Sequence, residues 1–244
     1  MPSKIDQELQ SIETRLAALE REKQTLLTKQ QALLARQPSI ASPATHSIET
    51  LSTQQKVELF SRLFRGRNDI YALRWENKQG RSGYSLACAN EWQQGLCHKP
   101  KIKCGECSNR AFKSIDEKVI YDHLTGKHTA GLYPLLNNDH CWLLAVDFDK
   151  SDWKLAVAAF SGACAAWNIP CAVERSRSGN GAHIWIFFDS RIPAQDARRL
   201  GFALLDSAME SHAGLSFDSY DRLFPNQDTM PNGRFGNLIA LPLQ

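Results

Sequence analysis

The stretch LLAVDFDK, residues 143–150, limits the possible folds of this chain most strongly. Its continuous apolar run is typical of a strand that is buried on both faces, near the centre of a sheet. Asp147 and Asp149 interrupt that run, and a buried carboxylate is costly unless it is paired or binds a metal. Side chains two positions apart point to the same side of a strand. The stretch therefore predicts a central strand that carries a metal-binding acidic pair.

Apolar periodicity predicts alternating helices and strands in the second half of the chain. Helical patterns cover 117–124, 152–167 and 193–212, and strand patterns cover 130–136, 141–148, 171–176, 182–188 and 236–243. Their interleaving predicts an α+β or mixed α/β fold with a sheet of at least four strands. Another helix is expected from about 52 to 63, with Ser52 or Thr53 as its N-cap.

The N-terminal region shows a heptad pattern. Apolar residues recur at alternating steps of four and three between 5 and 33, which predicts a coiled coil that binds a partner or a second copy of the chain. The polar Lys23 and Gln30 occupy a positions of this pattern. The alternative is a single amphipathic helix that lies on its own domain. We expect a coiled-coil helix over 1–37, a linker over 38–52, a zinc-binding module over 53–114 and a catalytic core over 115–244.

Composition bears on location and partners. No run approaches the roughly 20 apolar residues of a membrane helix, and the polar N-terminus lacks a signal-peptide core, so we expect a cytoplasmic protein. Residues 56–113 carry 12 Lys and Arg against 5 Asp and Glu, whereas residues 131–244 carry 9 against 12. This asymmetry suits a polyanion-binding segment joined to a domain with metal-binding carboxylates, although a solvated basic face would explain it as well.

Four cysteines fall within 20 residues of one another, which suggests a structural zinc site: Cys88, Cys97, Cys104 and Cys107. The last two form a C-x2-C knuckle around Gly105. His98 could replace Cys97 as a ligand, and reduced thiols in a loop are the alternative to any metal.

Basic and aromatic residues surround this knuckle. The basic ones, which we expect to bind nucleic acid, are Lys99, Lys101, Lys103 and Arg110. Tyr84, Trp92 and Phe112 lie nearby and could stack on unpaired bases. They could equally form the core of a small domain, and for Trp92 we expect the core.

A glycine-rich loop follows the strand that ends at Glu174. Its backbone N–H groups, over 178–181, could line an anion-binding concavity beneath Arg175 and Arg177, with His183 donating to a phosphate oxygen. The alternative is an ordinary hairpin loop with a histidine at the edge of the core. Further on, LSFDSYDRLFPNQD contains Asp218, with Asp221 and Asp228 close by. A third acid from this stretch could join the pair, so that two divalent ions could be held for nucleotidyl transfer.

The motifs DFD, SGNGAH and FDSYD, in this order and spacing, resemble the three motifs of the archaeo-eukaryotic primase superfamily. FRGRNDIYALRWENKQGRSGYS, the four cysteines and DSYDRLFPNQDTMPNGRFGNLIALPLQ are more similar still to the primase-polymerases of TOTE conflict systems and to CRISPR-associated relatives. The resemblance covers roughly residues 56–244. The chain ends soon after its last predicted strand, where such relatives continue, so we expect a fragment or a short form.

The resemblance implies a role for several positions. Asp147 and Asp149 would bind catalytic Mg²⁺ or Mn²⁺, with Asp218 as the third acid and Asp221 as its alternative. Gly181 stands where the family's Ser-x-His motif has serine, which leaves that serine's role open for Ser178. The residues expected to bind the nucleotide are His183, Ser178, Gly179, Arg175 and Arg177. The implied fold pairs a small βαβ-type unit with a sheet like that of an RNA-recognition motif, and the active site lies between them.

The resulting hypothesis is a primase-polymerase that uses Mg²⁺ or Mn²⁺ and a structural zinc ion. Its substrates would be NTPs or dNTPs and a single-stranded DNA or RNA template, in mobile-element or defence-associated DNA metabolism. Two rival functions remain from the sequence alone, a two-metal nuclease and a zinc-containing nucleic-acid-binding adaptor without catalytic activity.

Overall fold

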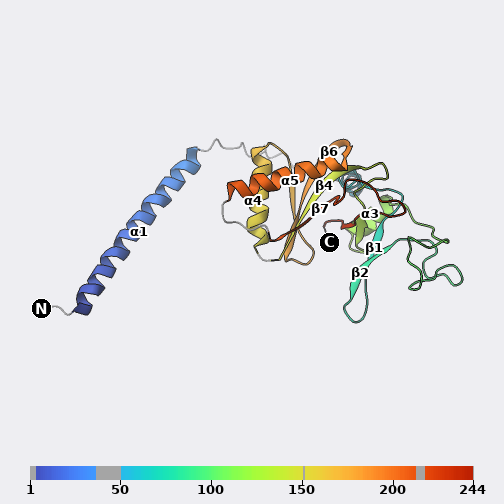
Figure 1. Cartoon of the computed structure of the whole chain (residues 1–244), viewed down its shortest axis with the longest axis horizontal. Coiled ribbons are helices and arrows are strands. Elements are labelled where there is room, and N and C mark those ends of the chain that lie inside the picture. The colour runs from blue at the N-terminus through green and yellow to red at the C-terminus, as the bar shows by residue number, and fades with distance from the viewer. Residues whose placement is uncertain (1–3, 37–50, 151, 213–217, 244) are drawn as a thin grey trace. The chain divides into compact units, whose positions relative to one another are not determined.

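The computed structural model describes residues 4–36, 51–150, 152–212 and 218–243, which fall into two units, 1–51 and 52–244. The first unit is one long helix, α1 (Lys4–Arg36), which confirms the predicted helical pattern (Figure 1). Four apolar residues of its heptad seam are more than half exposed: Ile12, Leu16, Leu19 and Leu26. Self-association through this seam remains a prediction. Within the described ranges, no helix is long and apolar enough to cross a membrane.

The second unit is an α+β fold with two antiparallel sheets. Its elements are α2 (Thr53–Leu63), β1 (Ala72–Glu76), β2 (Ser82–Leu86), α3 (Glu117–Leu124), β3 (Ala130–Leu132), β4 (His140–Asp149), α4 (Trp153–Ala166), β5 (Ala172–Arg175), β6 (Gly181–Pro193), α5 (Ala194–Ser211), β7 (Tyr220–Phe224) and β8 (Ile239–Ala240). The main sheet has the strand order β5-β6-β4-β7, and the small sheet has the order β2-β1-β3-β8. The predicted fold class is therefore confirmed at the level of mixed helices and sheets.

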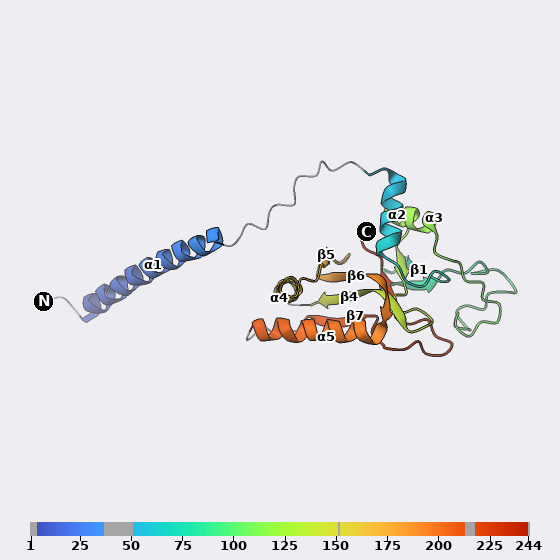
Figure 2. The same ribbon diagram turned by 90° about the horizontal axis from the view of Figure 1, so that it is seen from above.

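The main sheet has β4 between β6 and β7, as the apolar run of β4 predicts. Helices α4 and α5 cover one face (Figure 2), where Val146 and Phe148 of β4 pack against Phe160 and Leu204. On the other face, Leu143 packs in a core shared with α2, α3 and the small sheet. Both faces of β4 are thus buried, and its two carboxylates lie at its C-terminal end.

The small sheet joins segments from distant parts of the sequence. Strands β1 and β2 come from the range 53–114, whereas β3 and β8 come from 115–244, so the two ranges expected as separate modules share one sheet. Helix α2 begins with the capping box of Ser52 and Gln55 and buries Val57 and Phe60 in the core of this half. Strands β1 and β2 were not predicted, because their sequence is polar and lacks regular alternation.

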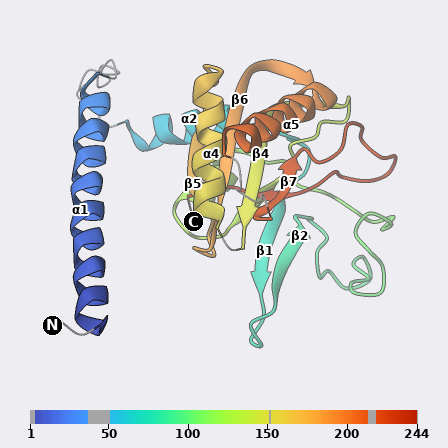
Figure 3. The same cartoon turned by 60° about the vertical axis from the view of Figure 1, so that its left-hand side comes forward.

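The cysteine segment lies between β2 and α3 and contains neither helix nor extended strand. Figure 3 shows it as a long green loop beside the β1–β2 hairpin. An isolated antiparallel bridge between Cys88 and Phe112 closes the base of this loop. The loop is therefore anchored to the small sheet at both of its ends.

Candidate active site

A row of polar residues crosses the main sheet at the C-terminal end of β4. Glu174 of β5 pairs with His183 of β6, His183 pairs with Asp147 of β4, and Asp147 pairs with Arg222 of β7. Because directly paired residues on neighbouring strands lie side by side on one face, the four side chains form a continuous line. The histidine lies between two carboxylates, and Arg222 lies on the other side of Asp147.

Asp147 and Asp149 lie on this face, two positions apart on β4. Burial raises the pKa of Asp147, and the negative charges of Asp221 and Asp149 raise it further, against the opposing effect of His183 and Arg222. One oxygen of Asp149, Oδ1, is buried without a hydrogen-bond partner in the described part of the chain. Buried carboxylate oxygens of this kind are the ligands that Mg²⁺ and Mn²⁺ take. The acidic pair therefore fits a divalent cation.

A one-residue irregularity in β7 sets the position of Asp221. Asp147 pairs with Arg222, but Phe148 pairs with Tyr220, so Asp221 is the extra residue of a β-bulge. Tyr220 packs against Phe148 in the core under α4 and α5. Because a bulge sets two residues opposite one on the partner strand, Asp221 and Arg222 both lie opposite Asp147, and the charge of Asp221 raises the pKa of Asp147.

The other candidate acids of this region lie differently. Asp218 is exposed in a turn before β7, and the Nε of Arg198 donates to Asp228 across 2.6 Å. The choice of Asp218 as third acid remains a prediction, and the geometry favours its alternative, Asp221. The carboxylate of Asp221 accepts a hydrogen bond from Arg222 Nε at 2.6 Å.

His183 is held by a carboxylate, Glu174, for which the sequence predicted no role. Its Nδ1 lies 3.0 Å from Glu174 Oε2, the same oxygen that accepts a hydrogen bond from Trp185 Nε1 at 3.1 Å. With Nδ1–H donating to Glu174, the other ring nitrogen, Nε2, faces Asp147 Oδ1 at 3.5 Å. Glu174 is therefore a positioning residue. The β5–β6 hairpin register could have revealed it, since a short turn sets Glu174 opposite His183.

The glycine-rich loop is compact and uses much of its own hydrogen-bonding capacity. The N–H of Gly179 donates to Ser176 O at 2.8 Å, and the N–H of Asn180 donates to Ser178 Oγ at 3.3 Å. Two of the amides expected to line an anion-binding concavity are thus engaged inside the loop. Arg175 also points inward, donating through Nε and Nη2 to Gly179 O at 3.0 and 2.8 Å.

Arg177 and Gly181 at this loop differ in the space around them. Arg177 is exposed, and it forms no ion pair within the described ranges. At Gly181 an added Cβ would lie 2.5 Å from Phe148 O, so only glycine fits there. The serine of the expected Ser-x-His motif is consequently excluded at this position by the close approach of β4.

Comparison with known proteins identifies the family to which this chain belongs. The family model described as the archaeo-eukaryotic primase domain of the TOTE conflict system matches residues 55–244. The chain belongs to this primase family. No curated protein matches the chain. The resemblance read from DFD, SGNGAH and FDSYD is therefore confirmed for the family.

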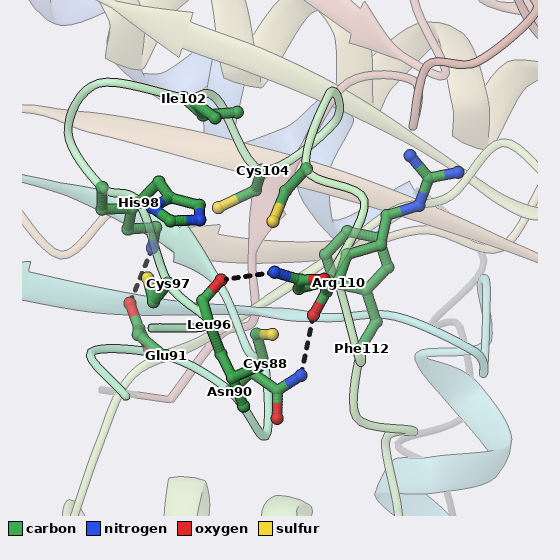
Figure 4. Close-up of a pocket in the computed structure, with 13 residues that line it drawn as sticks. Cys88, Asn90, Glu91, Leu96, Cys97, His98, Ile102, Cys104, Arg110 and Phe112 are labelled. Atoms are coloured by element: carbon green, nitrogen blue, oxygen red, sulfur yellow. Dashed lines mark hydrogen bonds and ion pairs between the residues drawn. The ribbon is translucent and has the colours of Figure 1, made fainter. Parts of the chain in front are cut away.

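In this TOTE-type primase domain the four predicted cysteines surround one small cavity (Figure 4). The cavity measures about 20 Å³, close to the space of a single water molecule or ion. The N–H of Ala111 donates to Cys88 Sγ at 3.3 Å. The donor set fits zinc, although among the described residues no group of three or more His, Cys, Asp or Glu side chains has the close approach of bound ligands.

The basic residues of the primase domain's cysteine segment differ in their availability. Lys99 is half-buried and pairs with Glu91 at 2.7 Å; burial opposes its charge, but Glu91 and Cys104 raise its pKa overall. Arg110 donates to Gly105 O at 2.7 Å. Lys101 and Lys103 are exposed.

The aromatic residues near the knuckle divide between core and surface. Tyr84 and Phe112 pack against a small cluster around Ile70 and Tyr133, as expected for core residues. The expectation for Trp92 was wrong, because its side chain is 71% exposed.

Proposed function

We propose that this primase domain is a metal-dependent nucleotidyltransferase that starts or extends a nucleic-acid strand on a template. The observation that supports this most directly is the row Glu174, His183, Asp147 and Arg222, with Asp149 two positions beyond Asp147 on β4. Three carboxylates on one face, beside a histidine and an exposed arginine, match the needs of triphosphate chemistry. The function goes beyond the family assignment and requires its own test.

The carboxylates that would hold Mg²⁺ or Mn²⁺ are Asp147, Asp149 and Asp221. The bulge in β7 and the charge effect of Asp221 on Asp147 favour Asp221 over Asp218 as the third ligand. When bound, such ions stabilise the charge of the transferring phosphoryl group and the attacking hydroxyl. Arg222 holds the carboxylate of Asp221 in place through the 2.6 Å contact.

The triphosphate would lie between His183 and the glycine-rich loop. Glu174 fixes the ring of His183, so that Nε2 is directed toward Asp147 and the phosphates bound beside it. Arg177 would supply positive charge from the rim of the loop, where it is exposed. Ser178 and Gly179 would contact the phosphates only if the loop rearranges, because their groups and those of Arg175 are hydrogen-bonded internally.

The cysteine segment would hold a structural zinc ion and contact nucleic acid. Four thiolates around a cavity of about 20 Å³ would bring this loop to one conformation when a cation binds. Lys101 and Lys103 then offer positive charge at its surface for phosphate binding, and for a second triphosphate during initiation.

The decisive experiment measures incorporation of labelled nucleotides on single-stranded DNA with Mg²⁺ or Mn²⁺, with and without a primer. A double variant, Asp147→Asn with Asp149→Asn, serves as control because it keeps side-chain volume and removes charge. Product that depends on these acids supports nucleotidyl transfer, and product without primer indicates a primase. Metal-dependent shortening of DNA without nucleotides would instead indicate a nuclease, and DNA binding without turnover would indicate an adaptor.

A further inference from the structure

A groove of about 570 Å³ lies between the β1–β2 hairpin and the cysteine segment. Its volume is in the range of sites that hold small molecules or single nucleotides. Two of its walls carry tryptophans that are unusually exposed, Trp75 at 44% and Trp92 at 71%. Two exposed aromatic side chains on the walls of one groove are typical of a recognition surface, whereas a single exposed one is common.

Trp75 is held in position by the strand opposite it. It pairs with Gly83 of β2, and a Cβ added at Gly83 would lie 3.0 Å from the indole ring. The ring therefore lies directly on the glycine backbone, which has no side chain to displace it. One surface of the indole is fixed against the sheet, and the other remains open to the groove.

Trp92 is exposed although its backbone is strained. Its φ is +63°, in the left-handed region that costs a non-glycine residue of order 1 kcal/mol or more. Burial of the indole does not offset that cost, because most of the ring is in solvent. Lys99 Nζ lies 5.7 Å from the ring centroid, which places a positive charge at the indole.

The groove is positively charged as well as aromatic. Arg74, Lys99 and Lys103 line it, but Arg74 pairs with Glu76 at 2.7 Å and Lys99 pairs with Glu91 at 2.7 Å. Within the described ranges Lys103 forms no ion pair, so its charge is available to a ligand. Exposed aromatic rings beside an unpaired cation are a combination that binds single-stranded nucleic acid.

Tyr84 on β2 is affected by one charge from the groove and one from the glycine-rich loop. Burial raises the pKa of Tyr84 on β2, and the charges of Arg177 and Arg74 oppose that rise. Arg177 belongs to the glycine-rich loop, and Arg74 lines the groove. Both arginines therefore act on the same phenol, so the groove and the nucleotide side of the active site lie within electrostatic reach of it.

We propose that the groove binds unpaired bases of a single-stranded nucleic acid, which stack on Trp75 and Trp92 while Lys103 contacts the backbone phosphate. The proposal rests on the proposed function, because it assigns to the template strand a binding site outside the acidic cluster. A protein partner that uses the same tryptophans is the other class of ligand, and the test below distinguishes it.

The test measures binding of fluorescently labelled single-stranded DNA by anisotropy at fixed salt. Double replacement Trp75→Ala with Trp92→Ala should weaken binding roughly tenfold or more, as expected for loss of stacked bases. Trp167→Ala removes another exposed indole, 47% exposed, from the end of α4 and should leave binding unchanged. Replacement of both groove tryptophans by Phe keeps an aromatic face and should restore most of the affinity.

Further measurements separate this proposal from its competitors. Zinc content and thermal unfolding of each variant verify folding, and the single variant Trp92→Ala replaces the double variant if the latter unfolds. Equal losses for single-stranded and duplex DNA, or no loss for either, would overturn base stacking. The double variant Asp147→Asn with Asp149→Asn should bind single-stranded DNA like wild type. Failure of the proposed function, measured by nucleotide incorporation, is then distinguishable from failure of groove binding, measured by anisotropy. Wild-type protein that does not bind single-stranded DNA would also overturn the proposal.

Discussion

The proposed mechanism uses Asp221 as the third metal-binding carboxylate, and the substitution Asp221→Asn tests this assignment. The substitution keeps the volume of the side chain and one oxygen but removes its negative charge. Asp221 is close enough to Asp147 to raise the pKa of that carboxyl, and it lies on the same face of the main sheet. A cation held by Asp147 and Asp149 would therefore lie beside Asp221 as well.

The expected size of the effect follows from Coulomb's law. One unit charge about 4 Å from another interacts by about 4 kcal/mol at an effective dielectric constant of about 20. Since each 1.36 kcal/mol is a factor of about ten in rate, complete loss of one such interaction costs about 10³-fold. The remaining amide oxygen recovers part of it, so we expect kcat/KM for nucleotide incorporation to fall between about 10²- and 10³-fold.

The matched control is Asp218→Asn, which makes the same chemical change in the exposed turn before β7. Here we expect a change of roughly twofold or less, as for most surface substitutions. Primer extension is measured for both variants over a range of Mg²⁺ and Mn²⁺ concentrations. A large loss in Asp218→Asn together with near-normal activity of Asp221→Asn would refute the argument from the β-bulge.

Three further predictions concern stability and metal content. Gly181→Ala places a Cβ 2.5 Å from Phe148 O and should lower the free energy of unfolding by about 1–3 kcal/mol. Gly162→Ala, whose Cβ would have no atom within 4 Å, should raise the free energy of unfolding by about 0.5–1 kcal/mol. Urea titration measures both variants, and equal stabilities would contradict the close packing at Gly181. Burial lowers the pKa of His123 from 6.5, so its contribution to stability is complete above that pH and is lost as the pH falls through the lowered value. His123→Gln should therefore flatten the dependence of the free energy of unfolding on pH in this range. An unchanged slope would be inconsistent with a neutral buried ring. Cys104→Ser should reduce the bound zinc measured by mass spectrometry and lower Tm, and an undiminished zinc content would remove Cys104 from the ligand set.

The central strand was predictable because its evidence is local. A run of apolar residues identifies β4 as buried on both faces, and spacing alone places Asp147 and Asp149 on one side. The strong helical patterns of α3, α4 and α5 also appear within one or two residues of their predicted ends. These features depend only on residues close together in the chain.

The remaining features depend on pairing between distant segments. Strand β1 forms through the contact of Trp75 with Gly83 and through its pairing with β3, which no local pattern signals. The position of Asp221 depends on a bulge of one residue in β7, which places it opposite Asp147. Exposure of Trp92 follows from the path of a loop that has no periodic structure. None of these features can be read from the periodicity of the sequence, because each depends on how distant segments or irregular loops are placed.

The electrostatic arrangement of the main sheet explains why such an acidic site is compatible with folding. A carboxyl whose pKa is raised in the folded state, as for Asp147, binds its proton more tightly there, so its effect on stability becomes less favourable as the pH rises through that pKa. His183 and Arg222, on the strands at either side, oppose this cost, and Glu174 fixes the orientation of His183. Because strand register determines the face of each side chain, a slip of one residue in β6 or β7 would move these partners to the side of α4 and α5. The residues that oppose the cost of burying Asp147 are therefore also those that would position a nucleotide. The stability of this region and its proposed chemistry depend on the same strand register.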